Sequence, residues 1–474
     1  MKKHIINALV MYNKIIKTDC GGCMNFGEYL EELIRKRDLS INALSNECKI
    51  NRGGLYSVFK NQRKLKSDQL FNLISKLALT KTEEKKLKEL YFKELYGQET
   101  FERINFLLSL IKNCDLHIDT ENFISALDND AIKKIQCFLN QNNVVITNFP
   151  FDFLEVDALF FNAVKSGKIT EFTHIILFDD GGGYKSNYNS IFKSLKYMCL
   201  HQFPYYFYTS IKSINENTIM PYFAIGNRTA LLFTKDQGIE IACPHSVKIL
   251  KQKAESLLAK CKTFGMKIEN VIQVKNFYQK GISNGSTAVT LSSYPCLSLF
   301  LDKETMISTI KPELPNKEAL VNIAYSHYSN LPKHIQSIDI VPESGIKKFA
   351  KTGNLCEFSE ELVNFVDVEH RIRILEKIVA AIESNKFFLL DKNKISIQPG
   401  IMIEKYVNKV IFFRFNEEKN NFSTYDSFYA DLEDFSLVND FNLMYEYIIK
   451  SRLVCSTDYS VQFINNIIEE LKTI

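Results

Sequence analysis

At 474 residues the chain is long for a single domain, and the usual domain size of about 100–200 residues predicts two to four domains. A hydrophobic content of 46% and an aromatic content of 12% are enough to build folded cores, which excludes a wholly disordered chain. A net charge of only +4 excludes a polyelectrolyte, so any nucleic-acid signal must come from local clustering of charge.

The cysteines and the apolar runs predict a cytoplasmic protein. Eleven cysteines are scattered without a disulfide framework, which indicates reduced thiols. No apolar run approaches the roughly 20 residues needed to span a bilayer, so we expect no membrane partner. Cys20 and Cys23 have the spacing of half a zinc site, but no second pair or histidine follows nearby. We therefore expect neither a metal nor another cofactor.

Residues 1–23 are expected to be an N-terminal extension rather than part of a domain. Gly21 and Gly22 lie just before Met24, and their codons can spell GGAGG, a ribosome-binding sequence. This spacing predicts that translation starts at Met24 and that the first domain covers residues 24–97.

Residues 24–97 have the apolar spacing of five helices. In the first, Phe26, Leu30 and Leu33 recur at helical intervals, with charged residues on the opposite side. Helices are then predicted over 41–48, from 52 to about 61, from 68 onward, and from 81 to the glycine at 97. Three of these have N-terminal capping signals, namely Ser40, Asn51 and the Thr80-x-x-Glu83 capping box.

The third predicted helix and the loop after it carry an unusual charge pattern. Residues 24–97 hold 15 Lys/Arg and 10 Asp/Glu, a net charge of +5, so the rest of the chain sums to about −1. Between residues 50 and 67 there are five cations, no acid and two adjacent glycines, Gly53 and Gly54. Because a glycine in a helix costs about 1 kcal/mol relative to alanine, we expect this pair to allow close approach of the backbone to DNA.

A short helix, a turn of about three residues and a cationic helix make a helix-turn-helix, whose second helix lies in the major groove. The cations beyond that helix are placed to contact phosphates, which position a protein without reading sequence. The candidate DNA-binding residues are Ser40, Asn42, Asn51, Arg52, Gly53, Gly54, Tyr56, Ser57, Lys60, Arg63, Lys64 and Lys66. The alternative for this segment is a small helical bundle that contacts other proteins.

Four short segments carry a family resemblance: Arg37-Asp38-Leu39-Ser40, Leu44-Ser45, Ile50-Asn51-Arg52 with Leu55, and Leu70, Ile74 and Leu77-Ala78. With these residues, positions 24–79 resemble the Cro/CI-type helix-turn-helix of the XRE family of transcriptional regulators. The family often has glycine where this chain has Lys49, and a Glu-x-Gly where it has Phe59 and Asn61. Asparagine tolerates the left-handed conformation, so Asn61 can replace the glycine.

The remaining residues are expected to form two α/β domains, 98–284 as a sensor and 285–474 as a second sensor or oligomerisation domain. Residues 98–140 have helical spacing. Strands are predicted at 143–149, 173–178, 204–209, 221–225, 229–234 and 238–243, the last three as a meander, followed by a helix over 246–264. The second domain has a predicted helix near 367–384 and strands at 386–390 and 409–415. No internal repeat is evident.

Two segments approach catalytic motifs without matching them. FDDGGGYKS (178–186) lacks the glycine spacing of a phosphate-binding loop, and its Asp179 and Asp180 could hold Mg²⁺ or form an exposed turn. His245 and Lys248 are too far apart for the His-x-Lys pattern of phospholipase D enzymes. We therefore assign no catalytic residue.

The sequence predicts an α+β multidomain protein, with an N-terminal all-α helix-turn-helix bundle followed by a large mixed α/β region. Its predicted function is a cytoplasmic, bacterial-type transcriptional regulator that binds double-stranded DNA as a homodimer. Helix 81–96 or the α/β region would supply the dimer contact, and an unidentified small-molecule or peptide effector would be sensed. The alternative is an enzyme or defence effector whose helix-turn-helix delivers it to DNA or regulates its own gene.

Overall fold

The computed structural model describes residues 24–112, 129–151, 154–178, 183–198, 205–210, 222–233, 238–267, 287–319, 321–322, 325, 336–356, 362–414 and 428–473. The chain divides into two compact units, Met1–Glu102 and Arg103–Ile474, called unit 1 and unit 2 below. The predicted extension over residues 1–23 lies outside the described residues. No helix among the described residues is long and apolar enough to cross a membrane.

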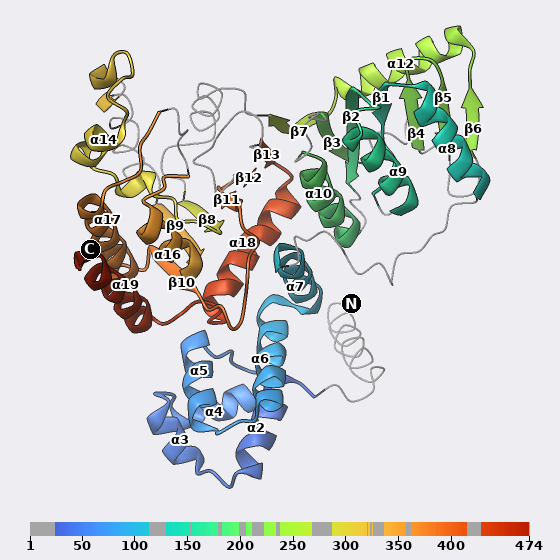
Figure 1. The fold of residues 1–474 in the computed structure, drawn as a ribbon. Helices are drawn as coiled ribbons and strands as arrows, with labels where there is room; N and C mark the ends of the chain where they lie inside the picture. The colour runs from blue at the N-terminus through green and yellow to red at the C-terminus, as the bar shows by residue number, and fades with distance from the viewer. Residues whose placement is uncertain are drawn as a thin grey trace, which may run out of the picture. The chain divides into compact units, whose positions relative to one another are not determined.

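Every element described in unit 1 is a helix, and each lies where the sequence predicted one (Figure 1). The helices are α2 (Phe26–Lys36), α3 (Ile41–Glu47), α4 (Arg52–Phe59), α5 (Ser67–Lys76), α6 (Lys81–Tyr96) and the start of α7 (Gln98–Lys112). Helix α4 ends two residues earlier than predicted, because the chain turns at Asn61.

The ends of these helices are set by local capping. Ser40 and Asn51 cap α3 and α4 with side-chain oxygens, and Thr80 forms the predicted capping box with Glu83. After four of the helices the chain turns through a non-glycine residue with positive φ, namely Asp38, Lys49, Asn61 and Ala78. The left-handed conformation expected of Asn61 is therefore confirmed.

Helices α2 and α4 come very close together at Gly27. A β-carbon on Gly27 would lie 2.3 Å from the carbonyl oxygen of Val58 and 2.8 Å from that of Phe59. Both distances are well below van der Waals contact, and both neighbours are backbone atoms that cannot move independently. The glycine therefore sets the spacing at which α4 packs against α2.

Unit 2 is built on a mixed β-sheet. The described strands form one 13-stranded sheet in the order β10-β9-β8-β11-β12-β13-β7-β3-β2-β1-β4-β5-β6. Their bounds are β1 (Val144–Thr147), β2 (Glu171–Phe178), β3 (Tyr205–Ser210), β4 (Tyr222–Gly226), β5 (Ala230–Phe233), β6 (Gly238–Ile241), β7 (Lys262–Lys267), β8 (Thr287–Ser292), β9 (Gln336–Pro342), β10 (Phe387–Leu390), β11 (Ile401–Lys405), β12 (Val410–Arg414) and β13 (Phe428–Leu432). The predicted mixed α/β character is thus confirmed, including the β4-β5-β6 meander.

Helices pack on both parts of this sheet. They are α8 (Asn129–Gln141), α9 (Leu154–Lys165), α10 (Tyr184–Met198), α12 (Pro244–Leu258), the 3-10 turn η2 (Ser298–Phe300), α14 (Lys303–Thr309), α16 (Glu343–Thr352), α17 (Val368–Glu383), α18 (Phe435–Lys450) and α19 (Thr457–Lys472). Helices α8, α9 and α12 lie around β1 to β6, whereas α16, α17 and α19 lie beside β9 and β10 (Figure 1). The helix predicted over 246–264 was too long, because residues 262–267 pair with β3 and β13 as strand β7.

The sheet consists of the same strand arrangement twice, a repeat that the sequence did not reveal. In the first half the order is β3-β2-β1-β4-β5-β6, with β1, β2 and β3 parallel and the rest antiparallel. In the second half the order is β10-β9-β8-β11-β12-β13, with β8, β9 and β10 parallel and the rest antiparallel. The outer parallel strand of each half also has an antiparallel neighbour, which is strand β7 beside β3 in the first half and a single bridge residue, Val454, beside Leu390 of β10 in the second.

The two halves also share a motif at the end of their first strand, ITNFP (146–150) and LSSYP (291–295). Thr147 Oγ1 donates to the carbonyl oxygen of Phe223 in β4 at 2.7 Å and accepts from the amide two residues further on at 3.4 Å. Ser292 makes the corresponding bonds, to the carbonyl oxygen of Ile401 in β11 at 3.5 Å and from the amide two residues on at 3.2 Å. We infer that the two halves are an internal duplication.

The expected boundary at residues 284–285 therefore falls between the two halves of one sheet. Strand β7 precedes this boundary and β13 follows it, and the two pair directly, with Gly265 opposite Ala430. Residues 103–284 and 285–474 are for this reason two halves of unit 2 that share a sheet.

We expect Gly27→Ala to destabilise unit 1 by about 1–3 kcal/mol, because the added methyl group would overlap backbone atoms of α4. Gly53→Ala is the matched control, since a β-carbon there would have no atom within 4 Å. The control should be neutral or more stable by about 0.5–1 kcal/mol, as expected for alanine in an exposed helix. Urea unfolding followed by circular dichroism measures both changes, and equal midpoints for the two variants would contradict the packing described here.

Candidate nucleic-acid interface

Helix α4 has one buried side and one exposed side. Leu55, Val58 and Phe59 are buried against the rest of unit 1, whereas Arg52, Gly53 and Lys60 are exposed. The turn that precedes the helix contains Lys49 with a φ of 54° and ends at the cap Asn51. Four residues, 48–51, thus separate α3 from α4, and the last of them is the cap.

Two of the predicted interface residues act as helix caps. Asn51 Oδ1 accepts a hydrogen bond from the amide of Gly54 at 2.6 Å, and Ser40 Oγ accepts one from Ala43 at 3.5 Å. Asn42, in the first turn of α3, is exposed. The caps fix the direction in which both helices begin, so they position the interface even where they do not contact a ligand.

The two adjacent glycines have different structural roles. A β-carbon on Gly54 would lie 2.6 Å from Asn51 Oδ1 and 2.7 Å from a guanidinium nitrogen of Arg63, so this glycine makes room for the cap and for that arginine. A β-carbon on Gly53 would meet no atom within 4 Å. The close approach of a ligand to the backbone thus remains a prediction for Gly53, whereas Gly54 is explained by its contact with the cap.

Polar side chains surround Gly53 on the exposed side of α4. The Arg52 guanidinium lies 5.7 Å from the centre of the Tyr56 ring, and Tyr56 is 37% exposed. Ser57 Oγ donates to the carbonyl oxygen of Gly53 at 2.9 Å. An exposed cation, an exposed phenol and an open stretch of helix backbone thus lie together on one surface.

The loop after α4 contributes further cations. Lys60, Arg63 and Lys66 are exposed, but Lys64 is held by its own unit, because its Nζ donates to the carbonyl oxygen of Glu94 at 2.7 Å. The loop is anchored by Leu65, whose carbonyl oxygen accepts a hydrogen bond from the buried Tyr91 hydroxyl at 2.9 Å. Burial raises the pKa of Tyr91 to about 12, so this hydroxyl keeps its proton at neutral pH.

Ion pairing leaves part of the positive charge of unit 1 uncompensated. Within residues 24–112, none of the cations Arg52, Lys60, Arg63, Lys64 and Lys66 forms an ion pair. Five other cations of the unit each pair with a glutamate, namely Lys36 with Glu32, Arg37 with Glu83, Lys76 with Glu47, Lys88 with Glu84, and Lys93 with Glu89. The remaining cations of residues 24–97, namely Arg35, Lys49, Lys81, Lys85 and Lys86, also form no ion pair within the described residues. What sets α4 and the loop after it apart is that residues 50–67 hold five cations and no acid.

The predicted dimer contact on helix 81–96 is only partly exposed. Leu87 and Tyr91 are buried in unit 1 itself, at 0% and 4% exposure, because they pack inside the helical bundle. They are not available to a second subunit in this fold.

The Mg²⁺ site that the sequence suggested for unit 2 falls on residues that the structure does not describe. Asp179 and Asp180 lie outside the described residues. Within the described ranges, no group of three or more His, Cys, Asp or Glu side chains is placed to hold a metal ion.

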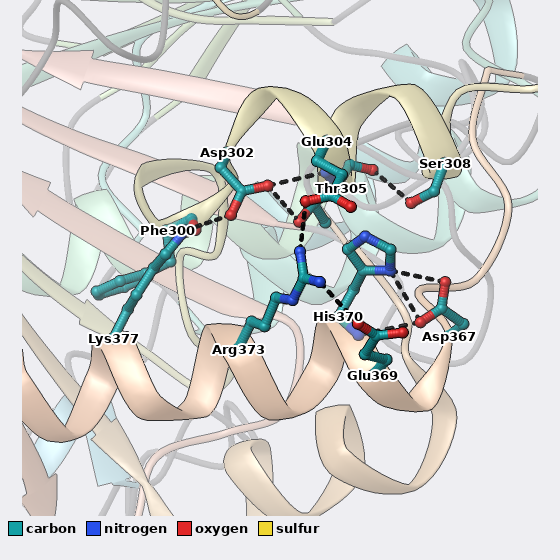
Figure 2. A network of polar contacts seen from close by, with 10 residues as sticks. All are labelled: Phe300, Asp302, Glu304, Thr305, Ser308, Asp367, Glu369, His370, Arg373 and Lys377. Atoms are coloured by element: carbon teal, nitrogen blue, oxygen red, sulfur yellow. Dashed lines mark hydrogen bonds and ion pairs between the residues drawn. The ribbon is translucent and has the colours of Figure 1, made fainter.

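A polar network in unit 2 joins α14 to α17 (Figure 2). Asp302 caps α14 by accepting from Thr305 N at 2.8 Å, and its other oxygen accepts from Lys377 Nζ of α17 at 2.8 Å. Arg373 of α17 reaches Glu304 of α14 at 2.5 Å. Burial alone would raise the pKa of Asp302, but the hydrogen bonds from Lys377 and Thr305 outweigh it and hold the pKa well below its usual range.

The N-terminus of α17 contains an Asp-His pair in the same network. Asp367 caps the helix by accepting from His370 N at 3.0 Å, and its two carboxylate oxygens lie 2.9 and 2.8 Å from His370 Nδ1. The opposite edge of the imidazole points toward α14 (Figure 2). These contacts show that Asp367 and His370 form the N-terminal cap of α17.

Comparisons with known proteins add little to this geometry. No protein-family model matches the chain, and no curated protein is significantly similar to it. Among solved structures, the chain is similar to phosphatidylserine synthase from Haemophilus influenzae Rd KW20, with 8% identity and a TM-score of 0.24 over 72% of this chain and 90% of that chain. A TM-score this low supports no argument about this protein.

We expect Asp302→Asn to lower the stability of unit 2 at neutral pH by about 0.5 kcal/mol, because the asparagine keeps the helix cap but loses the charge that faces Lys377. The effect is small because both side chains are more than one-third exposed. A carboxylate with a lowered pKa stabilises the fold above its unfolded pKa of about 3.9, and this contribution is lost as the pH falls through the folded value. The difference in urea midpoint between wild type and variant should therefore shrink below about pH 4. A difference independent of pH would contradict the assignment.

Proposed function

We propose that this protein is a cytoplasmic transcriptional regulator, in which residues 24–97 form a helix-turn-helix DNA-binding domain of the XRE type. Helices α3 and α4 are its paired helices, and α4 enters the major groove. Unit 2 acts as the sensing or oligomerisation region.

The observation that carries this proposal is the run of exposed cations on α4 and the loop after it, with no acid between residues 50 and 67 and with open backbone at Gly53. A cation that already has a carboxylate partner gives up that partner when it binds phosphate, whereas an unpaired cation releases only counterions from the DNA. An α-helix with its side chains is about 10–12 Å across, which fits the roughly 12 Å width of the major groove. Arg52 is placed at the start of the helix, where side chains reach base edges, and Lys60, Arg63 and Lys66 follow at its other end.

We expect the double variant Arg52→Ala with Lys60→Ala to bind duplex DNA more weakly and with a smaller salt dependence. The slope of log K against log salt should fall by about 0.9 for each cation that contacts a phosphate, because fewer counterions are released. Loss of Arg52 should also lower the preference for the operator sequence by about 1–3 kcal/mol if its side chain contacts a base edge. Fluorescence anisotropy at several salt concentrations measures both quantities.

The matched control is Lys36→Ala with Lys93→Ala, which removes the same charge from two cations that are ion-paired with Glu32 and Glu89. This control should keep nearly the wild-type affinity and salt slope. Equal losses in the two double variants would show that only net charge matters, and binding that is independent of salt would refute the DNA assignment.

We also expect two copies of the chain to bind one operator. A single helix-turn-helix reads only a few base pairs, and paired half-sites usually lie roughly 10 base pairs apart. Sedimentation of the complex with labelled DNA measures the stoichiometry. One copy bound to a single half-site would contradict this expectation.

A further inference from the structure

Helix α7 carries the chain from unit 1 into unit 2. It is one continuous helix, Gln98–Lys112, and the boundary between the units falls within it, after Glu102. From Arg103 onward it belongs to unit 2, where Ile104, Leu107 and Ile111 are almost completely buried. The part of α7 in unit 2 is therefore fixed by packing.

Residues 103–112 contact both halves of the duplicated sheet region. Phe106 lies 6.2 Å from the ring of Tyr184 and 6.5 Å from that of Tyr188, both on α10, which belongs to the first half. Arg103 Nε lies 3.6 Å from Asp440 Oδ2 on α18, which belongs to the second half. These three helices lie side by side in unit 2 (Figure 1).

The same two helices are joined to each other by a buried hydrogen bond. The Tyr188 hydroxyl donates to Asp440 Oδ2 at 2.6 Å, and the two residues are only 0% and 3% exposed. Arg103 faces the same carboxylate oxygen, so a single atom of Asp440 connects α7, α10 and α18. Because the carboxylate is buried, losing either contact is costly, and a movement of one half relative to the other must alter the position of α7.

We propose that this Arg103–Asp440–Tyr188 junction couples unit 2 to DNA binding, with α7 as the connecting element. The proposal deepens the proposed function and rests on it. An effector that shifts the two halves of unit 2 would change the anchoring of α7 and, through the continuous helix, the conformational freedom of the DNA-binding domain. Coupling of this kind is reciprocal, so binding of DNA must also change the stability of α7 in unit 2.

The test compares variants of the full-length chain. Tyr188→Phe removes the hydroxyl, and Asp440→Asn removes the charge that faces Arg103 while keeping a hydrogen-bond acceptor. Tyr294→Phe is the matched control, because its hydroxyl is equally buried and donates to the carbonyl oxygen of Asn354 at 2.7 Å. The probe is a mixed-sequence duplex of about 30 base pairs, long enough for two half-sites. Circular dichroism melting confirms that each variant is folded.

We expect Tyr188→Phe and Asp440→Asn to lower DNA affinity by about 2- to 30-fold, because a loosened α7 has more conformations to lose on binding. Tyr294→Phe should lose similar stability but bind DNA like the wild type. In the wild type, DNA should also slow hydrogen exchange of the amides at 103–112, which a purely structural junction would not produce.

The coupling would be overturned if both junction variants bound DNA with wild-type affinity and if DNA did not change the hydrogen-exchange rates of the amides at 103–112. The proposed function would remain intact in that case. An equal loss of affinity in Tyr294→Phe would also overturn it, because the effect would then follow from stability alone. If the wild-type chain shows no salt-dependent binding to the duplex, both proposals fail.

Discussion

The packing of α4 against α2 is the constraint on which the candidate interface depends. An isolated helix of eight residues is not stable in water, so α4 owes its structure to tertiary contacts and to its cap. Gly27 permits the close approach, and Asn51 satisfies an amide at the start of the helix. Once Leu55 and Val58 are buried, the opposite side of the helix must face outward. The outward orientation of Arg52 and Gly53 therefore follows from the packing of Leu55 and Val58 in the core of unit 1.

The two halves of unit 2 have the same strand arrangement but different residues in their cores. The hydroxyl at the end of β1 or β8 donates to the neighbouring antiparallel strand in both halves, at the place where the parallel and antiparallel parts of the sheet meet. The residues around it differ. Gly226 lies opposite Val145 in the first half, whereas in the second half the buried Glu404 lies opposite Thr290 and accepts a hydrogen bond from the Tyr406 hydroxyl at 3.0 Å. The two halves have thus diverged in the polarity of their cores while keeping their strand pairing.

The helices of unit 1 could be predicted from the sequence because their signals are local. Apolar residues recur every three or four positions, and Ser40, Asn51 and Thr80 cap helices within three residues of themselves. The strands of the first half were also predictable from short apolar runs. The sequence did not predict β7, β8, β9, β11 or β13, and it did not reveal the duplication, because the two halves share strand pairing and only short stretches of similar residues.

The sequence by itself determined the number and order of the helices in residues 24–97, the excess of positive charge there and the presence of two glycines in α4. Only the tertiary structure decided which of these groups are available to a ligand. Lys64 donates to the backbone carbonyl oxygen of Glu94, thirty residues away, and Gly54 leaves room for the side chain of the cap Asn51. The five ion-paired cations of the unit have glutamate partners one helical turn away or on other helices. Whether a side chain can contact a ligand depends on the residues beside it in the folded protein. Distance along the sequence does not determine which residues these are.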